Sequence, residues 1–386
     1  MFVRLRGVEI YKTIGFKDIA LIYGDTEKSY QKTARLINRI RHQEQGGTPS
    51  RTLHDCTEKE GREALRYIDQ RARCILKENG FTEDGTCRDI KLEYNKKRPV
   101  TLPNQLVLKT VDKCCQDQNI NVDAVLMNPV PYENPENSTE ISIDDVNVKK
   151  QEEFRPGGIK SERGKRKYIH NTIAHISKAD AGKYVLNGPG TKTVLRFLIA
   201  FLVHNGLTGD RVQFFTDGHK VLNDSIFKWF SWYKNIGIIL DWYHLEKKCK
   251  EQLSLALTGR FIRNEILDKL KPLLWYGLVD EAVTLLQAID QDSIKKIETI
   301  NKLIEYLRRN KPHIPCYAVR KELGLCNSSA IGEKMNDLVV SSRQKHNGMS
   351  WSKAGSVGLA TITAIKRNGE NKKWFETKRL NFKLAA

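Results

Sequence analysis

Long apolar runs, paired cysteines and internal repeats are all missing from this sequence of 386 residues. The longest uninterrupted apolar run, Phe197 to Val203, is far shorter than the roughly 20 residues that a transmembrane helix needs. The first residues, MFVRLRGVEI, lack the apolar region of a secretory signal. We therefore expect a cytoplasmic protein without transmembrane helices.

The eight cysteines form no Cys-x-x-Cys pair and follow no regular spacing, which is typical of free thiols in a reducing compartment. Because no segment of about 20 to 50 residues repeats, a solenoid is excluded. The chain is long enough for more than one domain, and 40% apolar residues exclude a wholly disordered protein.

Positive charge is in clear excess. The sequence has 65 Lys and Arg against 46 Asp and Glu, a formal net charge of +19. Such a surplus attracts polyanions in a salt-dependent way. Nucleic acid is therefore the first partner to test, although a ribosome or an anionic membrane surface also fits the charge.

A helical pattern with a glycine-containing break occupies residues 28–61. Apolar or small residues recur there at steps of three and four, namely Tyr30, Thr33, Ala34, Ile37 and Ile40, before GGTPSRTL interrupts them. We expect Ser50 or Thr48 to cap a second helix that exposes Arg51. This pattern is typical of a helix-turn-helix DNA-binding module, and an ordinary helical hairpin fits it as well. Further helix and a proline-punctuated linker are predicted up to residue 137.

The second part of the chain mixes strands with helices. Strands are predicted at residues 141–146, 167–177, 182–188, 211–217 and 236–244, and helices at 191–206 and 221–233. Three hairpin-linked strands followed by strand–helix alternation predict an α/β fold with a mixed sheet, in the strand order of the ribonuclease H-like fold. Residues 245–310 predict an all-helical insertion, with an apolar stripe of Ile294, Ile297, Ile300, Leu303, Ile304 and Leu307.

Two acidic positions lie where such a sheet would hold a site. Asp217 ends an apolar strand, and ligands bind open α/β sheets at the carboxyl ends of their parallel strands. Asp144 and Asp145 lie in the first strand, which would neighbour the strand of Asp217. A bound cation would relieve the repulsion between such carboxylates, whereas a surface or capping role is the alternative. Only one of Asp144 and Asp145 can face the site, and the sequence leaves both open.

A third acidic residue is expected from a helix near the same edge of the sheet. Glu333 opens such a helix, on which Arg343 and Lys345 are expected to face a phosphate backbone. Alone, Glu333 also fits the acidic residue that the helix dipole favours in a first turn.

Together these segments resemble a known family. The series ISIDD, FFTDGHKVL, IILDWYHLEKKC and AIGEKMNDLVVSSRQK is similar to the catalytic domain of bacterial insertion-sequence transposases of the DDE type, in the Mutator-like group with a long helical insertion. Asp241-Trp-Tyr-His244, expected at the end of the fifth strand, matches the C/D-x-x-H element of that group. The similarity covers residues 141–369, and SYQKTARLINRI with GGTPSRTL resembles the helix-turn-helix that precedes it.

The resemblance implies a DNA transposase that cuts and joins strands at insertion-sequence ends, with Asp144, Asp217 and Glu333 as ligands of two Mg²⁺ (or Mn²⁺) ions. It implies a catalytic role for His244, on the scissile phosphate or on Asp241, although a lone histidine also fits a structural role. Trp242 and Tyr243 are expected to stack on a base or to pack in the core.

The partners that the resemblance implies are double-stranded DNA with terminal inverted repeats, target DNA and further copies of the chain in a dimer or larger assembly. It implies no membrane partner and a location at the bacterial nucleoid. The basic residues expected to contact phosphates are Arg51, Lys165, Arg166, Lys167, Arg343 and Lys345.

Five regions are expected along the chain. They are a helical DNA-binding region with a linker (1–137), the first part of the core (138–244), the helical insertion (245–325), a closing catalytic helix region (326–365) and a basic tail (366–386). Two other functions stay open, a transposase-derived DNA-binding protein without catalysis and a structure-specific nuclease of the same fold.

Overall fold

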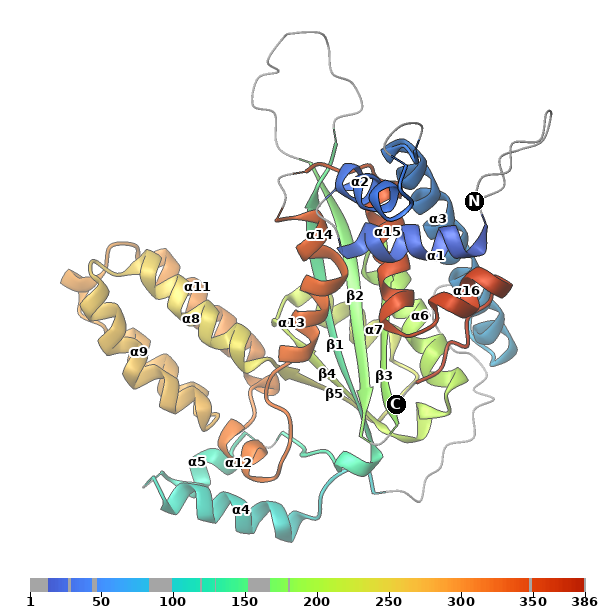
Figure 1. Cartoon of the computed structure of the whole chain (residues 1–386). Helices are drawn as coiled ribbons and strands as arrows, with labels where there is room; N and C mark the ends of the chain where they lie inside the picture. The colour runs from blue at the N-terminus through green and yellow to red at the C-terminus, as the bar shows by residue number, and fades with distance from the viewer. Residues whose placement is uncertain are drawn as a thin grey trace. The chain divides into compact units, whose positions relative to one another are not determined.

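The computed structural model describes residues 13–26, 29–43, 47–82, 99–118, 120–128, 130–151, 167–179, 181–346 and 349–384. The chain divides into two compact units (Figure 1). The first unit comprises Met1–Leu92, Ile143–Leu207 and Ile331–Ala386, and the second comprises Glu93–Ser142 and Thr208–Ala330. Within the described residues, no helix combines the length and the apolar character that crossing a bilayer would require.

One five-stranded mixed sheet forms the α/β core. Its strands are β1 (Ser138–Lys149), β2 (Tyr168–Lys178), β3 (Gly182–Gly188), β4 (Arg211–Thr216) and β5 (Ile236–Leu240), in the order β3-β2-β1-β4-β5. β2 and β3 are antiparallel, whereas β4 is parallel to both β1 and β5. The predicted mixed sheet is confirmed, as are the helices that separate its later strands, α6 (Thr191–His204) and α7 (Lys220–Trp229).

Strand β1 has buried side chains on both faces of the sheet. Ile141 and Ile143 are buried on one face, and Val146 and Val148 are buried on the other. Because side chains alternate between the faces, Asp144 shares its face with Val146 and Val148, and Asp145 shares the opposite face with Ile143. The residues of β4 are buried throughout, as expected of a central strand in a parallel arrangement.

Helices surround the strands of the first unit. They are α1 (Ile14–Thr26), α2 (Tyr30–Ile40), α3 (Ser50–Glu78), α6, α13 (Ala330–Asn336), the π-turn η5 (Asp337–Ser341), α14 (Ser342–Gln344), α15 (Lys353–Arg367) and α16 (Asn371–Thr377). α3 packs closely on α15, where a Cβ added to Gly61 would lie 2.4 Å from Cα of Gly358. No side chain fits in that space, so Gly61 permits the close approach of the two helices.

The start of α3 differs from the prediction. Pro49 is its N-cap residue and makes no side-chain cap bond, so neither Ser50 nor Thr48 caps the helix. Thr48 is instead buried, with its amide donating to Oδ1 of Asn38 at 2.7 Å and its carbonyl accepting from Nδ2 of Asn38 at 3.2 Å. Asn38 therefore fixes the connection between α2 and α3.

A buried carboxylate links segments from three parts of the first unit. Glu60 of α3 is 1% exposed and pairs with Lys17 of α1 at 2.8 Å. It also binds Lys378, which follows α16, and accepts from Nε1 of Trp374 at 3.3 Å. Burial of a charge is tolerated here because Glu60 has partners of opposite charge.

The second unit is mostly helical beyond β4 and β5. Its helices are α4 (Asn104–Gln116), α5 (Val122–Leu126), η1 (Pro135–Asn137), η2 (Leu207–Gly209, which begins at the last residue of the first unit), α7, α8 (Trp242–Ala256), α9 (Arg260–Trp275), α10 (Val279–Gln287), η3 (Gln291–Ser293), α11 (Ile297–Asn310), η4 (Lys311–His313) and α12 (Tyr317–Glu322). The helices predicted over residues 245–310 are present, and Ile300, Leu303, Ile304 and Leu307 of the predicted stripe are buried. Ile297 is 44% exposed, so it does not belong to that stripe.

The segment predicted to be a linker is partly folded. α4 and α5 lie within it, and Val111, Cys115 and Val125 pack with Cys316 and Val319 in one apolar cluster. The prolines and polar residues of the segment favoured the prediction of a linker over that of two short amphipathic helices.

Candidate active site

The structure separates the two neighbouring aspartates of β1. Nδ2 of Asn336 donates to Oδ2 of Asp144 at 3.0 Å. Asp145 accepts instead from the hydroxyl of Thr172 on β2, and Oγ1 of Thr191 on α6 lies 3.5 Å from its Oδ2. Asp144 therefore faces α13, whereas Asp145 faces α6, as the alternation of the strand requires.

Glu333 lies half-buried on α13, three residues before Asn336. Residues three apart on a helix share one face, so the face of α13 that holds Asp144 also carries Glu333. Within the first unit, the structure thus brings the strand residue Asp144 to the helix of Glu333.

The helix predicted around residues 330–345 is present and contains a π-turn. α13 ends at Asn336, and the π-turn η5 follows it before α14 begins. The extra residue of a π-turn rotates all later side chains relative to an α-helix, and such turns are frequent at functional sites.

This rotation moves Arg343 away from the predicted phosphate contacts. Arg343 is 3% exposed, and its Cζ lies 5.1 Å from the ring centres of both Tyr30 and Trp351. The expectation that Arg343 faces a phosphate backbone is therefore wrong, because its guanidinium packs between two aromatic rings in the core. Lys345, two residues later, is exposed.

The other predicted phosphate contacts differ in their surroundings. Arg51 is exposed and pairs with Asp55, one turn along α3, at 2.9 Å. Lys167 is exposed at the start of β2. Lys165 and Arg166 lie outside the described residues.

In the second unit, Asp217 follows β4 in a loop whose main chain is held by α11. The hydroxyl of Tyr306 donates to the carbonyl of Asp217 at 2.9 Å, and Nη2 of Arg309 lies 3.4 Å from the carbonyl of Gly218. Burial, with the nearby charge of Asp217, raises the pKa of Tyr306, so its hydroxyl stays protonated and donates. The Asp217 side chain is half-buried, and its Oδ1 accepts from the amide of His219 at 2.8 Å.

Gly218 has a conformation and a packing that suit only glycine. Its φ is +75°, and a Cβ there would lie 2.8 Å from Cδ1 of Leu240 and 3.0 Å from the side-chain amide of Asn310. The turn after Asp217 therefore depends on the missing side chain.

A cavity of about 290 Å³ lies beside this loop within the second unit. Its lining combines acidic, basic and imidazole groups from the loop, α8 and α11, namely Asp217, Gly218, His219, His244, Lys247, Lys248, Glu251, Tyr306 and Arg309. Groups of both charges beside a half-buried carboxylate are suited to binding a polar, charged ligand.

The sequence predicted that Asp241 lies at the end of the fifth strand, but β5 ends at Leu240. Asp241 is the N-cap of α8, and its Oδ1 accepts from the amides of Tyr243 at 2.8 Å and His244 at 3.3 Å. Its Oδ2 accepts from the amide and hydroxyl of Ser329, and the side chain is 1% exposed. Asp241 thus acts as a buried helix cap.

The residues after Asp241 form the first turn of α8. The His244 side chain lines the cavity beside Asp217. Trp242 packs on Trp275 and Tyr317, with ring centres 4.8 Å and 5.0 Å apart, so its role is in the core. Tyr243 is 47% exposed and remains available to a ligand.

The three predicted metal ligands come from both units. Asp144 and Glu333 belong to the first unit, whereas Asp217 belongs to the second. Among the described residues, no group of three or more His, Cys, Asp or Glu side chains is arranged to hold a metal ion.

Sequence reasoning missed Tyr306 and Arg309. Both lie near the carboxyl end of α11. Tyr306 is the one buried residue of this helix that carries a hydroxyl. A hydroxyl at a core position needs a hydrogen-bond partner, which is the signal that could have identified Tyr306.

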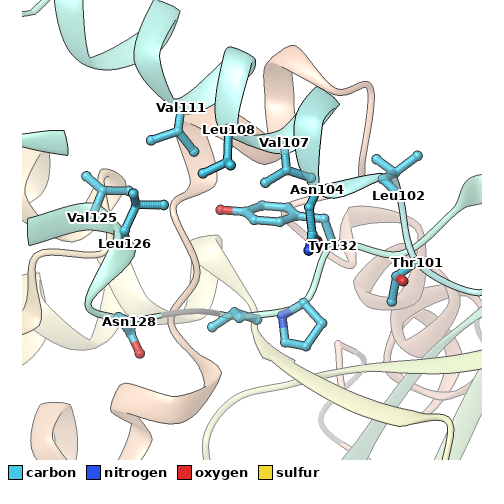
Figure 2. Close-up of a pocket in the computed structure, with 12 residues that line it drawn as sticks. Thr101, Leu102, Asn104, Val107, Leu108, Val111, Val125, Leu126, Asn128 and Tyr132 are labelled. Carbon is cyan, nitrogen blue, oxygen red and sulfur yellow. The ribbon is translucent and has the colours of Figure 1, made fainter. Parts of the chain in front are cut away.

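A second cavity, of about 360 Å³, lies in the second unit between α4, α5, Asn128 and residues 130–132. Figure 2 shows Val107, Leu108 and Val111 of α4 around the ring of Tyr132. Its lining has no Asp, Glu, His, Lys or Arg, and burial raises the pKa of its Tyr132, so this cavity lacks the carboxylates and charged groups that the first one has.

Comparisons with known proteins add one distant similarity. No protein-family model matches the chain, and no curated protein matches it. A solved structure described as "Mos1 transposase paired-end complex with left transposon end" aligns over 87% of this chain and 99% of its own, with 11% identity and a TM-score of 0.17. A TM-score this low does not establish a shared fold.

Proposed function

We propose that this chain is a metal-dependent DNA transposase with a ribonuclease H-like catalytic domain, in which Asp144, Asp217 and Glu333 are the metal ligands. The register of two parallel strands carries the proposal. β1 and β4 pair from Ser138 and Arg211 to Ser142 and Phe215, and each strand reaches its aspartate two residues after that last pair. Asp217 follows the carboxyl end of β4, where ligands bind open α/β sheets, and Asp144 lies within β1 just beyond its parallel pairing with β4.

The hydrogen bond between Asn336 and Asp144 supports the choice of Glu333 as the third ligand, since Glu333 shares the face of α13 with Asn336. The same bond favours Asp144 over Asp145, whose carboxylate faces α6.

The donor set suits Mg²⁺, which prefers oxygen ligands. Asp144, Asp217 and Glu333 would hold two such ions, and the ions would supply activation of the attacking oxygen and neutralisation of the leaving oxygen. The chain's own residues orient the carboxylates. The carboxylate of Asp144 accepts from Asn336 and from the amide of Asp145, and that of Asp217 accepts from the amide of His219. Water would first cut the DNA strand, and the freed 3′-hydroxyl would then attack target DNA.

DNA binding by the N-terminal helices is part of the proposal. α2 exposes Lys32, Arg35 and Arg39 at steps of three and four, which places three positive charges on one helix face. Arg51, Lys167 and Lys345 are also exposed. The net charge of +19 favours binding of a polyanion. The DNA partners would be terminal inverted repeats and target DNA, bound by two or more copies of the chain.

The proposal is tested with purified protein, Mg²⁺ and a duplex that carries the inverted repeats flanking the coding sequence. We expect wild-type protein to cut the repeat end and to join it to a second duplex, both visible on a denaturing gel. Asp217→Asn should abolish both steps and keep DNA binding in a gel-shift assay. Asp224→Asn, an exposed residue of α7, is the matched control and should behave as wild type.

Other results would exclude the proposal. Wild-type protein that binds the repeats without cutting them would indicate a binding protein. Cleavage of branched DNA without joining would indicate a structure-specific nuclease.

A further inference from the structure

Three basic residues of α8 and α11 line the cavity beside Asp217. Lys247, Lys248 and Arg309 are exposed, and within the described part of the chain no carboxylate lies at ion-pair distance from them. The carboxylates in the lining are Asp217 and Glu251, of which Glu251 is exposed on α8. The lining of the cavity therefore carries more cationic than anionic side chains.

Tyr306 brings two of these charges together. The ring of this 7% exposed residue has Nζ of Lys248 at 5.8 Å and Cζ of Arg309 at 5.7 Å from its centre. Like charges near one ring repel each other, and a bound anion would relieve that repulsion. Lys247 lies instead over the ring of Tyr243, at 5.9 Å.

The geometry favours a phosphate as that anion. Nη2 of Arg309 approaches the carbonyl of Gly218, which leaves the remaining N–H groups of the guanidinium for a ligand. A guanidinium beside an ammonium is a common pair for phosphate oxygens. The same ring that carries both cations also holds the main chain of Asp217 through its hydroxyl.

We infer that this cavity binds a DNA phosphate adjacent to the reacting one, with Lys248 and Arg309 as its ligands. The inference rests on the proposed function, since that function makes Asp217 a metal ligand at the site where the DNA strand is cut. Tyr306 is the positioning residue, because it contacts both cations and the main chain of Asp217. The helical insertion thus supplies part of the substrate site.

The test measures binding of the full chain to a fluorescent duplex of about 40 base pairs between about 50 and 200 mM salt. Each phosphate contact contributes about 0.9 to the slope of log affinity against log salt concentration. We expect Lys248→Ala and Arg309→Ala each to lower that slope by about 1, and the double variant by about 2. Arg309→Lys, which keeps the charge, should retain the slope.

The same helices provide matched controls. Lys250→Ala on α8 and Arg308→Ala on α11 remove exposed charges that do not line the cavity, and we expect the wild-type slope for both. If Lys248→Ala and Arg309→Ala change the slope no more than these controls do, the inference is wrong. Thermal melting of each variant checks that the fold is intact.

A second measurement locates the phosphate. Neutral methylphosphonate linkages are placed one at a time beside the cleavage position of the repeat duplex. One position should weaken binding by wild type and leave binding by the double variant unchanged, and equal sensitivity of both proteins would contradict the inference. Wild-type protein that shows these binding differences but never cuts DNA would overturn only the proposed function. Cleavage without the binding differences would overturn only this inference.

Discussion

The two units hold their acidic residues in different ways. In the first unit, a side-chain amide from another element, Asn336, binds the carboxylate of Asp144 itself. In the second, Tyr306 and Arg309 bind the main chain at Asp217 and Gly218, and the carboxylate accepts from an amide of its own loop. The first arrangement fixes the rotation of a side chain, whereas the second fixes the position of a backbone segment.

The largest expected effect distinguishes two neighbours on β1. Asp144→Asn should lower the rate of strand cleavage at least about a thousandfold, as loss of an essential catalytic group does. Asp145→Asn should lower it by less than about tenfold, because Asp145 faces α6. Single-turnover cleavage assays on the repeat duplex measure both rates. The reverse order of the two losses would assign the site to the opposite face of β1.

A smaller effect concerns the backbone at Asp217. Gly218→Ala should lower the free energy of unfolding by about 3 kcal/mol, because it adds both a clash and a strained φ. Gly324→Ala is the matched control. Its φ of +70° is similar, but a Cβ there would meet no atom within 4 Å, so only about 1 kcal/mol of strain is expected. Urea unfolding measures both, and equal losses would show that the packing around Gly218 is unimportant.

The smallest expected effect is the loss of a single hydrogen bond, either to the Asp217 carbonyl or to the Asp144 carboxylate. Tyr306→Phe removes the bond to the Asp217 carbonyl and keeps the ring, whereas Asn336→Ala removes the bond to the Asp144 carboxylate. Each should lower kcat about fivefold, since a net hydrogen bond is worth about 1 kcal/mol, and should leave KM for DNA nearly unchanged. A change in KM without a change in kcat would mean that these residues support binding and not the position of the acids.

Much of the sheet was predictable from the sequence, because its strands are short apolar runs bounded by turns. Val212, Phe214 and Phe215 of β4 are buried as the pattern indicated. The sequence also limited the first acid to Asp144 or Asp145, since a strand presents them on opposite faces. The choice between them required the contacts of Asn336 and Thr191, which come from elements distant in the sequence.

Other features could not be predicted because they depend on local backbone geometry or long-range contacts. The π-turn after Asn336 rotates Arg343 into the core, and no residue type signals such a turn. Asp241 follows an apolar strand just as Asp217 does, yet it caps a helix that begins at the next residue. Whether such an aspartate ends as a cap or in a site depends on the next few residues and on partners such as Ser329.

The bonds of Glu60 have a consequence for synthesis of the protein. Because the Glu60 carboxylate has Lys378 and Trp374 as partners, the first unit cannot be completed until residues up to Lys378 have left the ribosome. Most of the second unit emerges earlier and as a nearly continuous stretch, so it can fold while translation continues. Until then, α1, α2 and α3 would expose the apolar side chains that the folded unit buries, and we expect chaperones to bind there.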